Sequence, residues 1–321
     1  MRNKNTAVLM SGSYCSVCKK KPSFFYRKYS GQKLCKKCFS ESIEAKVRAT
    51  ITKYSMLKFD DKLAIAVSGG KDSLSLLHIL AKLQKYRPKT SLTAITIDEG
   101  IKGYRDEALD IAEKNCNALQ IPLYITSFKE LFGLTLDELI IKLQAKGKTE
   151  LTPCAYCGVL RRRAINVAAR NIGATKIATA HTLDDETQTV LMNILRGDTD
   201  RLSKEKPITN YVHSMFIRKI KPFCEIPENE SALYAYIKKI TFQDTPCPYA
   251  SEALRNDIRT MLNNIEEKHT GTKFAISRTM EKLQPAIEQV LTKKDFKTCK
   301  DCGEPTSQIL CKTCEMLHQI R

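Results

Sequence analysis

Short apolar runs alternate along this chain with longer stretches that carry apolar side chains at helical spacing. One run, residues 63–67, holds five apolar and partly β-branched side chains, which predicts a buried β-strand. Apolar positions three and four apart over residues 74–85 then predict a helix with a broad buried face. Four further strands are predicted at 92–97, 121–126, 176–180 and 216–221, with helices at 105–119 and 187–195. This alternation predicts a doubly wound parallel α/β sheet, which binds ligands at the carboxyl ends of its strands.

The C-terminal part of the chain is expected to be largely helical. Pro227, followed by acidic residues, predicts a helix that has the proline in its first turn. Residues 251–292 carry a helical pattern that is interrupted near 270–272. No apolar run approaches the roughly 18 residues of a membrane span, and residues 1–6 do not resemble a signal peptide. A cytoplasmic protein without a membrane partner is therefore expected.

The turn between the first strand and the first helix reads Ser-Gly-Gly-Lys-Asp-Ser, residues 68–73. Two glycines permit a tight turn with positive φ. A turn that enters a helix N-terminus aims backbone N–H groups and the positive dipole end at one point, where a phosphate fits. Lys71 adds a charge and Ser73 a hydroxyl. The spacing is not the G-x-x-x-x-G-K-S/T of P-loop enzymes, and an ordinary strand-to-helix turn rarely needs Gly-Gly-Lys together.

The charge of the chain favours a polyanionic partner. Its 321 residues include 53 Lys and Arg against 35 Asp and Glu, a formal net charge of +18. Such an excess on a mid-sized enzyme is typical of nucleic-acid binding, and solubility is the alternative explanation. In a reducing compartment, the 13 cysteines point to metal binding or redox chemistry rather than to disulfides.

Eight of the cysteines form two tetrads. Each tetrad consists of two C-x-x-C pairs, Cys15, Cys18, Cys35 and Cys38 in one, and Cys299, Cys302, Cys311 and Cys314 in the other. Four thiolates complete a tetrahedral site and leave no position for substrate, which predicts two structural zinc ribbons, with iron as the alternative metal. Gly303 suits the tight knuckle turn. The aromatic and basic residues 24–29 could stack on RNA or form the core of the first ribbon.

Three of the five other cysteines are candidates for chemistry. Cys116 and Cys224 are expected to be buried and inert. Cys154 and Cys157 begin a helix rich in arginine, which favours thiolates, and Cys247 lies between two prolines. Three interpretations remain open from spacing alone: an iron–sulfur cluster with one iron left free, a redox pair with a persulfide on Cys247, or three unrelated thiols.

A cluster of polar residues follows the strand at 176–180. His181 precedes Asp184 and Asp185, and all three are expected at the carboxyl edge of the sheet, close to residues 68–73 and to Asp98. They could supply acid–base chemistry. Alternatively, the two aspartates are only first-turn residues that suit the helix dipole. We expect at least one of the aspartates to be functional.

The motif at 68–73 resembles the pyrophosphatase loop of the PP-loop ATP-pyrophosphatases. With both ribbons, C-A-Y-C-G at 154–158, A-H-T-L-D-D-E at 180–186 and C-P-Y-A at 247–250, the chain resembles the NcsA/TtuA tRNA 2-thiouridine synthetases nearly end to end. Residues 97–106, 157–162 and 191–198 are similar to the archaeal and eukaryotic branch that modifies the wobble uridine. The TtuA branch, which modifies the T-loop uridine, is less similar there.

The resemblance implies an AMP-forming tRNA sulfurtransferase that adenylates the C2 carbonyl of a uridine and replaces its oxygen with sulfur. It implies that Cys154, Cys157 and Cys247 hold a 4Fe–4S cluster, and that ATP and Mg²⁺ are used. It places ATP contacts on Ala66, Val67, Ser68, Gly69, Gly70, Lys71, Asp72, Ser73, Ile97, Ala180 and Asp185. A cluster-free persulfide mechanism at Cys247 and T-loop thiolation are the alternatives.

Two positions depart from the family pattern. Arg161 stands where the TtuA branch has a catalytic lysine, and because arginine cannot serve as a base, an electrostatic role is expected for it. Ala180 replaces a glycine. The expected partners are tRNA and a sulfur donor, either sulfide or a ubiquitin-like thiocarboxylate carrier, and the sequence leaves a homodimer open. The expected division is an N-terminal ribbon at 1–40, a catalytic PP-loop domain at 41–250, a helical segment at 251–292 and a C-terminal ribbon at 293–321.

Overall fold

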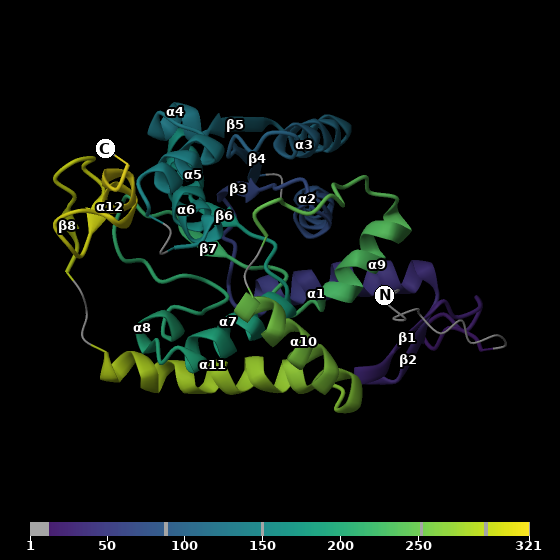
Figure 1. The fold of residues 1–321 in the computed structure, drawn as a ribbon. Helices are drawn as coiled ribbons and strands as arrows, with labels where there is room; N and C mark the ends of the chain where they lie inside the picture. Colours follow the sequence, from purple (N-terminus) through teal and green to yellow (C-terminus); the bar gives the residue numbers. More distant parts are fainter. Residues whose placement is uncertain (1–12, 87–88, 149–150, 251–252, 292–294, 321) are drawn as a thin grey trace.

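A five-stranded parallel sheet forms the centre of the protein (Figure 1). The computed structural model describes residues 13–86, 89–148, 151–250, 253–291 and 295–320. The sheet strands are β3 (Lys62–Ala66), β4 (Ser91–Asp98), β5 (Leu123–Ser127), β6 (Lys176–Ala178) and β7 (Arg218–Ile220), in the spatial order β5-β4-β3-β6-β7. All five predicted strands are present. β5 begins later than predicted because Pro122 has no N–H to donate to the ladder.

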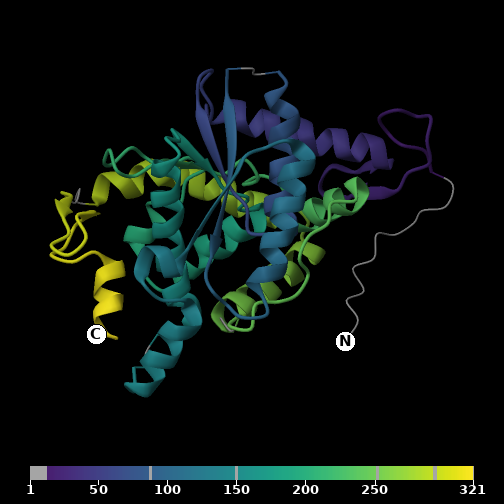
Figure 2. The same ribbon diagram turned by 90° about the horizontal axis from the view of Figure 1, so that it is seen from above.

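Helices cover both faces of the sheet (Figure 2). Successive β3 side chains point to opposite faces, so Leu63 and Ile65 lie in one apolar cluster and Ala64 in another. The first cluster includes side chains of α1 (Lys36–Lys53), α2 (Lys71–Gln84), α3 (Arg105–Leu119) and α9 (Glu228–Lys238). The second includes side chains of α4 (Phe128–Phe132), α5 (Leu136–Ala145) and α6 (Pro153–Asn171). These two layers confirm the predicted doubly wound α/β class.

The chain changes direction at the centre of the sheet. From β3 it builds outward through α2 and β4 to β5, and then returns through α6 to β6 on the other side of β3. The carboxyl ends of β3 and β6 therefore flank the point where the strand order reverses, and ligands bind at such points in open α/β sheets. The predicted loop at 68–73 follows β3 directly.

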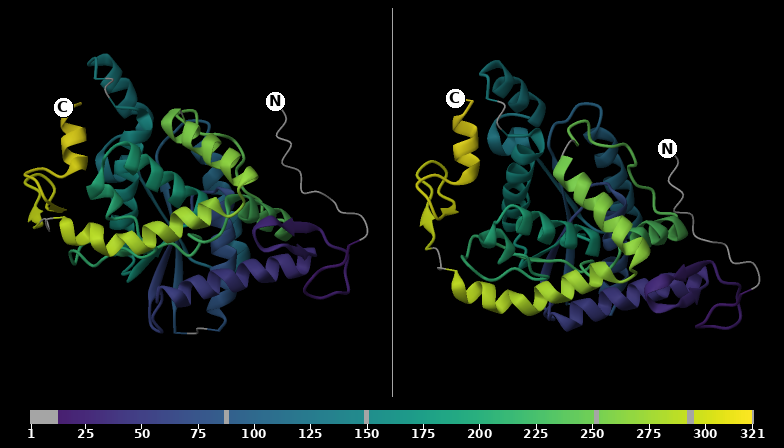
Figure 3. Two further views of the ribbon diagram at one scale, coloured as in Figure 1. Left: turned by 90° about the horizontal axis from the view of Figure 1, so that it is seen from below. Right: turned by 60° about the horizontal axis from the view of Figure 1, so that its bottom comes forward.

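A further layer consists of α7 (Leu183–Leu195), α8 (Thr199–Leu202), α10 (Ala253–Lys268) and α11 (Thr272–Val290). Met192 of α7 packs against Ile258 and Leu262 of α10, and α11 runs along one side of the molecule (Figure 3). The predicted helical segment is interrupted at Gly271, whose φ is +96°, and its predicted limits at 251 and 292 lie outside the described residues, as do residues 1–6. Pro227 is the N-cap residue of α9, not a first-turn residue as predicted.

The two small cysteine-containing ribbons lie at opposite ends of the molecule (Figure 1). The first contains β1 (Phe25–Arg27), a short 3-10 helix (Lys28–Ser30) and β2 (Gln32–Leu34), and the second contains β8 (Lys297–Thr298), β9 (Pro305–Thr306) and α12 (Lys312–His318). Buried Arg27 pairs with Glu230 of α9 at 2.7 Å, and buried Glu304 pairs with Arg163 of α6 at 2.7 Å. Within the described chain, no helix has both the length and the apolar character needed to cross a membrane.

Candidate active site

The loop between β3 and α2 has the geometry that its two glycines predict. Gly69 has a φ of +88°, and a Cβ at this position would lie 2.8 Å from the Cβ of Ala108 in α3. Gly70 is the N-cap residue of α2 and has no side chain with which to cap it. The amides of the first helical turn are therefore left for another acceptor, and the dipole of α2 favours an anion there.

Polar side chains hold this loop in shape. The Ser73 hydroxyl accepts a hydrogen bond from the Ser68 amide at 3.1 Å and donates to the Gly70 carbonyl at 2.9 Å. Lys71 Nζ lies 3.0 Å from Asp72 Oδ2 and 2.9 Å from Glu228 Oε1 of α9. Burial raises the pKa of Asp72, and the Lys71 ammonium opposes that shift. The Lys71 ammonium therefore lies between two carboxylates, beside the turn that suits a phosphate.

The other predicted ATP positions lie along the same edge of the sheet. Ala66 ends β3 and Val67 follows it, Ile97 lies near the end of β4, and Ala180 follows β6. Asp185 lies in the first turn of α7, where its Oδ2 accepts from the Thr182 amide at 2.9 Å and closes a capping box. The structure therefore brings these positions together at the carboxyl ends of adjacent strands.

His181 and Asp184 have partners that indicate structural roles. Asp184 is buried and forms an ion pair with Lys273 of α11, while its Oδ2 accepts from the Glu228 amide at 2.7 Å. His181 shares a 2.9 Å hydrogen bond with the hydroxyl of Thr179. The surrounding protein and the charge of Lys221 lower the pKa of His181 to about 4, so its imidazole is neutral near pH 7.

The cysteines 154, 157 and 247 come from two segments that meet at the start of α6. Thr152 caps this helix, and Cys154 Sγ donates to the Tyr249 carbonyl at 2.9 Å, which holds the segment after Cys247 against the helix. Cys157 and Cys247 belong to the same apolar cluster. Among the described residues, only the two tetrads bring three or more metal-ligating atoms within 4.8 Å. The three thiols are therefore not arranged around a single ion.

The prediction that the start of α6 favours thiolates is wrong for Cys157 in this structure. Burial raises the pKa of the Cys157 thiol to about 11, and the nearby Arg161 guanidinium only partly opposes that shift. The helix start is lined by apolar side chains, which penalise the charged form. Arg161 nevertheless donates from Nη2 to Cys157 Sγ at 3.2 Å.

Two charged residues that were not among the predicted site residues connect the loop to the cysteines. Glu99, which follows β4, is almost fully buried and lies 2.6 Å from Arg161 Nε and 2.7 Å from Arg105 Nε. Arg105 also donates to the Ser68 carbonyl at 3.0 Å. A continuous chain of contacts thus runs from the loop to Cys157. The available sequence signal was an acidic residue after a strand and an arginine at the start of a helix.

A second connection joins the loop to the segment that carries Cys247. The Gln243 amide donates to the Gly69 carbonyl at 2.9 Å, and the Gln243 side chain donates to the Tyr104 carbonyl at 2.7 Å. The Thr245 hydroxyl donates to Glu107 of α3 at 3.1 Å. The glycine loop therefore fixes the path of the chain toward Cys247.

Each cysteine tetrad is assembled as predicted, with its four Sγ atoms within 4.8 Å of one another. Cys35 and Cys311 cap α1 and α12, and each sulfur accepts from the amide three residues later at 3.5 Å. Burial raises the pKa of the Cys15 thiol, but hydrogen bonds from backbone N–H groups outweigh this effect and lower that pKa to about 6. The same two effects lower the pKa of Cys299 to about 6. Such donors stabilise the thiolates of Cys15 and Cys299, whereas burial raises the pKa of Cys38 and of Cys314; four sulfurs at this spacing can hold a metal ion. Gly303 has a φ of +74°, as its knuckle position requires.

The aromatic run of the first ribbon is only partly used for packing. Phe25 packs edge-on against Phe39 of α1, with ring centroids 5.0 Å apart, and so belongs to the ribbon core. Tyr29 packs against Phe274 of α11 at 4.8 Å. Tyr26 is exposed. Packing within the protein therefore accounts for Phe25 and Tyr29, and stacking on RNA stays a prediction for Tyr26.

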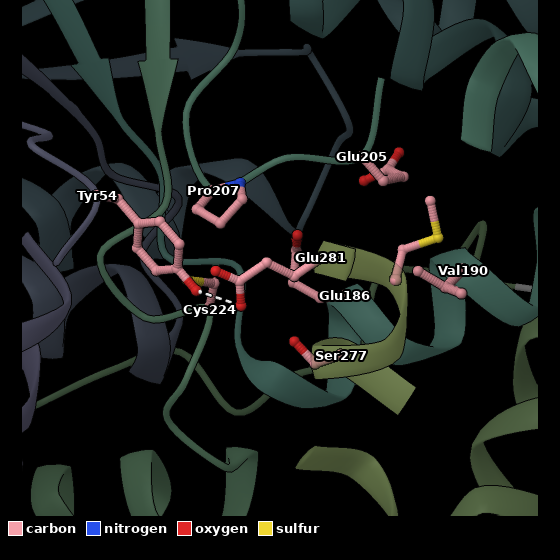
Figure 4. A pocket seen from close by; sticks show the side chains of 9 residues that line it. Tyr54, Glu186, Val190, Glu205, Pro207, Cys224, Ser277 and Glu281 are labelled. Carbon is pink, nitrogen blue, oxygen red and sulfur yellow. Dashed lines mark hydrogen bonds between the residues drawn. The ribbon is translucent and has the colours of Figure 1, made fainter. Parts of the chain in front are cut away.

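A separate small cavity of about 40 Å³ lies between α7, α11 and the segment before α9 (Figure 4). Its lining includes Tyr54, Glu186, Glu205, Cys224 and Glu281, and Tyr54 donates to Glu281 at 3.2 Å. Cys224 is buried there, and burial raises the pKa of its thiol, as expected for an inert cysteine. None of the predicted site residues lines this cavity.

Comparison with known proteins agrees with this geometry. A family profile described as "PP-loop domain" matches residues 40–266. A "probable sulfurtransferase" of Methanocaldococcus jannaschii is 37% identical over 303 residues, which cover 93% of this chain and 86% of that protein. "Cytoplasmic tRNA 2-thiolation protein 1" of Aspergillus niger is 35% identical over 312 residues, 97% of this chain and 89% of the relative.

The chain belongs to the PP-loop family of tRNA 2-thiolation proteins. A solved structure, the "U34-tRNA thiolase NcsA" of Methanococcus maripaludis with its 4Fe-4S cluster, matches with a TM-score of 0.82 at 34% identity and 96% coverage of both chains. Membership of this PP-loop family confirms the resemblance that the loop and the cysteine pattern indicate. It also confirms the fold class, including a cysteine tetrad near each end of the chain.

Proposed function

We propose that this protein is a cytoplasmic, AMP-forming tRNA-uridine 2-sulfurtransferase. One observation carries the proposal: the loop that suits a pyrophosphate is joined to Cys157 by the contacts of Arg105, Glu99 and Arg161, and to the segment that carries Cys247 by Gln243. An enzyme that activates a carbonyl with ATP and then replaces its oxygen needs both sites next to each other. The wobble uridine is the proposed target, as the name U34-tRNA thiolase indicates for the Methanococcus maripaludis relative.

The loop and the strand ends are proposed to bind ATP. The first amides of α2 and the Lys71 ammonium would stabilise the negative charge that develops on the departing pyrophosphate. Asp72 would orient Mg²⁺ beside it, and Asp185 would orient the nucleotide from the start of α7. In this step the uridine O2 forms a bond to the α-phosphorus, and the bond between that phosphorus and pyrophosphate breaks.

The cysteines 154, 157 and 247 fit an iron–sulfur cluster that keeps one iron without a protein ligand. Both cysteines outside this trio and the tetrads, Cys116 and Cys224, are buried elsewhere in the structure. When bound, such a cluster would supply a position at which sulfide is held for delivery to the activated carbon. The Arg161 guanidinium, held by Glu99, would stabilise negative charge on the Cys157 sulfur and on the leaving AMP.

The proposal also covers the metal in the two tetrads, the division of the chain, the binding of tRNA, the sulfur donor and the oligomeric state. Each tetrad would hold one structural zinc, and the boundaries proposed for the four parts are 1–40, 41–250, 251–292 and 293–321. The excess of basic residues would bind the phosphates of tRNA. Sulfide or a ubiquitin-like thiocarboxylate carrier would donate the sulfur, and assembly as a homodimer is the proposed oligomeric state.

Cys247→Ala tests the proposal, with Cys116→Ala as the matched control in a buried thiol outside the site. Anaerobically reconstituted Cys247→Ala should lose 2-thiouridine formation and iron while it keeps tRNA binding, and Cys116→Ala should keep all three. Thiolation by Cys247→Ala at the rate of the control would overturn the cluster mechanism. Normal activity of the wild type without iron would favour a persulfide on Cys247, and thiouridine mapped to the T-loop would replace the wobble assignment.

A further inference from the structure

Two basic side chains lie opposite each other beside the three cysteines. The Ile217 amide donates to Asn166 Oδ1 at 2.9 Å, which fixes the segment before β7 against α6. Arg162 lies one turn earlier on the same face of α6, and Lys219 lies two residues later on the same face of the strand. One helical turn and two strand residues advance by similar distances, about 5–7 Å, so the two side chains project toward the same region.

The direction of each side chain supports this placement. Lys219 is the register partner of Ile177, whose side chain lies in the apolar cluster beneath α6, and partners on neighbouring parallel strands share a face. The Arg162 guanidinium lies over Gly158, with Nη1 3.6 Å from where a Cβ of that glycine would be. Gly158 follows Cys157 directly, so the positive charge of Arg162 lies close to the start of α6, where Cys154 and Cys157 are located.

Within the described part of the chain, neither the Arg162 guanidinium nor the Lys219 ammonium has a hydrogen-bonded or ion-paired partner. The neighbouring carboxylates of Glu186 and Glu205 are both bound to Lys221, at 2.7 Å and 3.1 Å. Burial, followed by the charges of Arg162 and Lys221, lowers the pKa of Lys219 to about 8. Lys219 is partly buried and the Arg162 side chain is exposed, so the desolvation of Lys219 is costly unless an anionic ligand compensates its charge, and Arg162 is accessible to the same ligand.

We propose that Arg162 and Lys219 form a subsite for one phosphodiester of the substrate RNA, adjacent to the uridine that is thiolated. The inference rests on the proposed function and adds to it the group that positions the target nucleotide. A planar guanidinium with a flexible ammonium suits a phosphate with two free oxygens. Because Arg162 lies over Gly158, a phosphate held there would keep its nucleoside within reach of the cysteines at the start of α6.

ATP is the other source of phosphate at this edge of the sheet. The pyrophosphate loop follows β3, whereas Lys219 lies on β7, which is separated from β3 by β6. Lys71 and the first turn of α2 already provide a phosphate site at that loop. We therefore assign the Arg162–Lys219 pair to RNA, and a measurement of ATP affinity distinguishes the two.

The test uses the full-length, cluster-loaded protein with Arg162→Ala, Lys219→Met and the double variant. Lys114→Ala is the matched control, because Lys114 is an exposed cation of α3 paired with Asp110. Affinity is measured for a tRNA substrate over a series of salt concentrations, for the same tRNA with one uncharged methylphosphonate linkage next to the target uridine, and for ATP.

Each single variant should bind tRNA about tenfold more weakly, and in the double variant the salt slope should fall by about 0.7 because one phosphate is no longer neutralised. The methylphosphonate should weaken binding by wild type and Lys114→Ala but not by the double variant. ATP affinity and iron content should stay unchanged throughout.

Equal sensitivity of the double variant and the wild type to the methylphosphonate would overturn the subsite. If the variants bind ATP more weakly and bind tRNA as the wild type does, the Arg162–Lys219 pair belongs to the ATP site, and the proposed RNA subsite is also overturned. Failure of the proposed function is recognised separately, because the wild-type protein would then form no 2-thiouridine in the same tRNA. In that case the proposed subsite is also overturned, because it depends on that function.

Discussion

Replacement of Gly69 by alanine is the sharpest test of how the nucleotide loop is built. The added Cβ would lie 2.8 Å from the Cβ of Ala108 and 2.9 Å from its Cα and carbonyl oxygen. Two of these three atoms are backbone, so no rotamer change relieves the contact. The positive φ costs about 1–2 kcal/mol for an alanine, and overpacking against α3 adds about 1–3 kcal/mol. Gly69→Ala should therefore lower the free energy of unfolding by about 2–5 kcal/mol.

Gly173→Ala provides the matched control. Gly173 has a φ of +65° but nothing within 4 Å of the position of its Cβ, so only the backbone cost of about 1–2 kcal/mol applies. Urea unfolding followed by circular dichroism, on protein with its metal sites filled, measures both variants. ATP affinity is measured in parallel, and it should fall at least about tenfold for Gly69→Ala because the loop must shift, but not for Gly173→Ala.

A second substitution should partly rescue the Gly69→Ala variant. Ala108→Gly in the Gly69→Ala background removes the contact between the two Cβ atoms but leaves those with the Ala108 backbone, so part of the missing stability should return. If Gly69→Ala is no less stable than Gly173→Ala and binds ATP normally, the close approach of α3 does not shape this loop.

The remaining predictions concern the buried ion pairs and the metal sites. Glu99→Gln should destabilise the protein by about 3–5 kcal/mol in the same urea assay, because it leaves Arg105, a buried cation, without its carboxylate; a loss below about 1 kcal/mol would show that the Ser68 carbonyl and other acceptors suffice. Cys299→Ser should remove one equivalent of zinc and make the C-terminal ribbon sensitive to protease, since a tetrad that loses one thiolate no longer closes its site. Unchanged zinc content in Cys299→Ser, relative to Cys116→Ser, would contradict that assignment.

Residue patterns within short segments correctly predicted the strands, the principal helices and the cysteine tetrads. The five strands and the principal helices followed from apolar periodicity, and the cysteine tetrads followed from C-x-x-C spacing, because both depend on residues close together in the chain. The interruption of the C-terminal helices at Gly271 was predicted for the same reason. Where prediction failed, as for the pKa of Cys157, the cause was burial by side chains from other elements.

The sequence by itself determined which groups of this protein can do chemistry: the glycine loop, three cysteines outside the tetrads, and a large excess of basic residues. Only the tertiary structure decided which of these groups are connected by hydrogen bonds and ion pairs. Glu99, Arg105 and Arg161 come from three separate elements and meet because the carboxyl ends of parallel strands share one edge with the start of α6. The packing of α6 against the segment before β7 likewise brings the charges of Arg162 and Lys219 into the same region. Ion pairs between distant residues depend on how helices and strands pack, and periodicity along one segment does not contain that information.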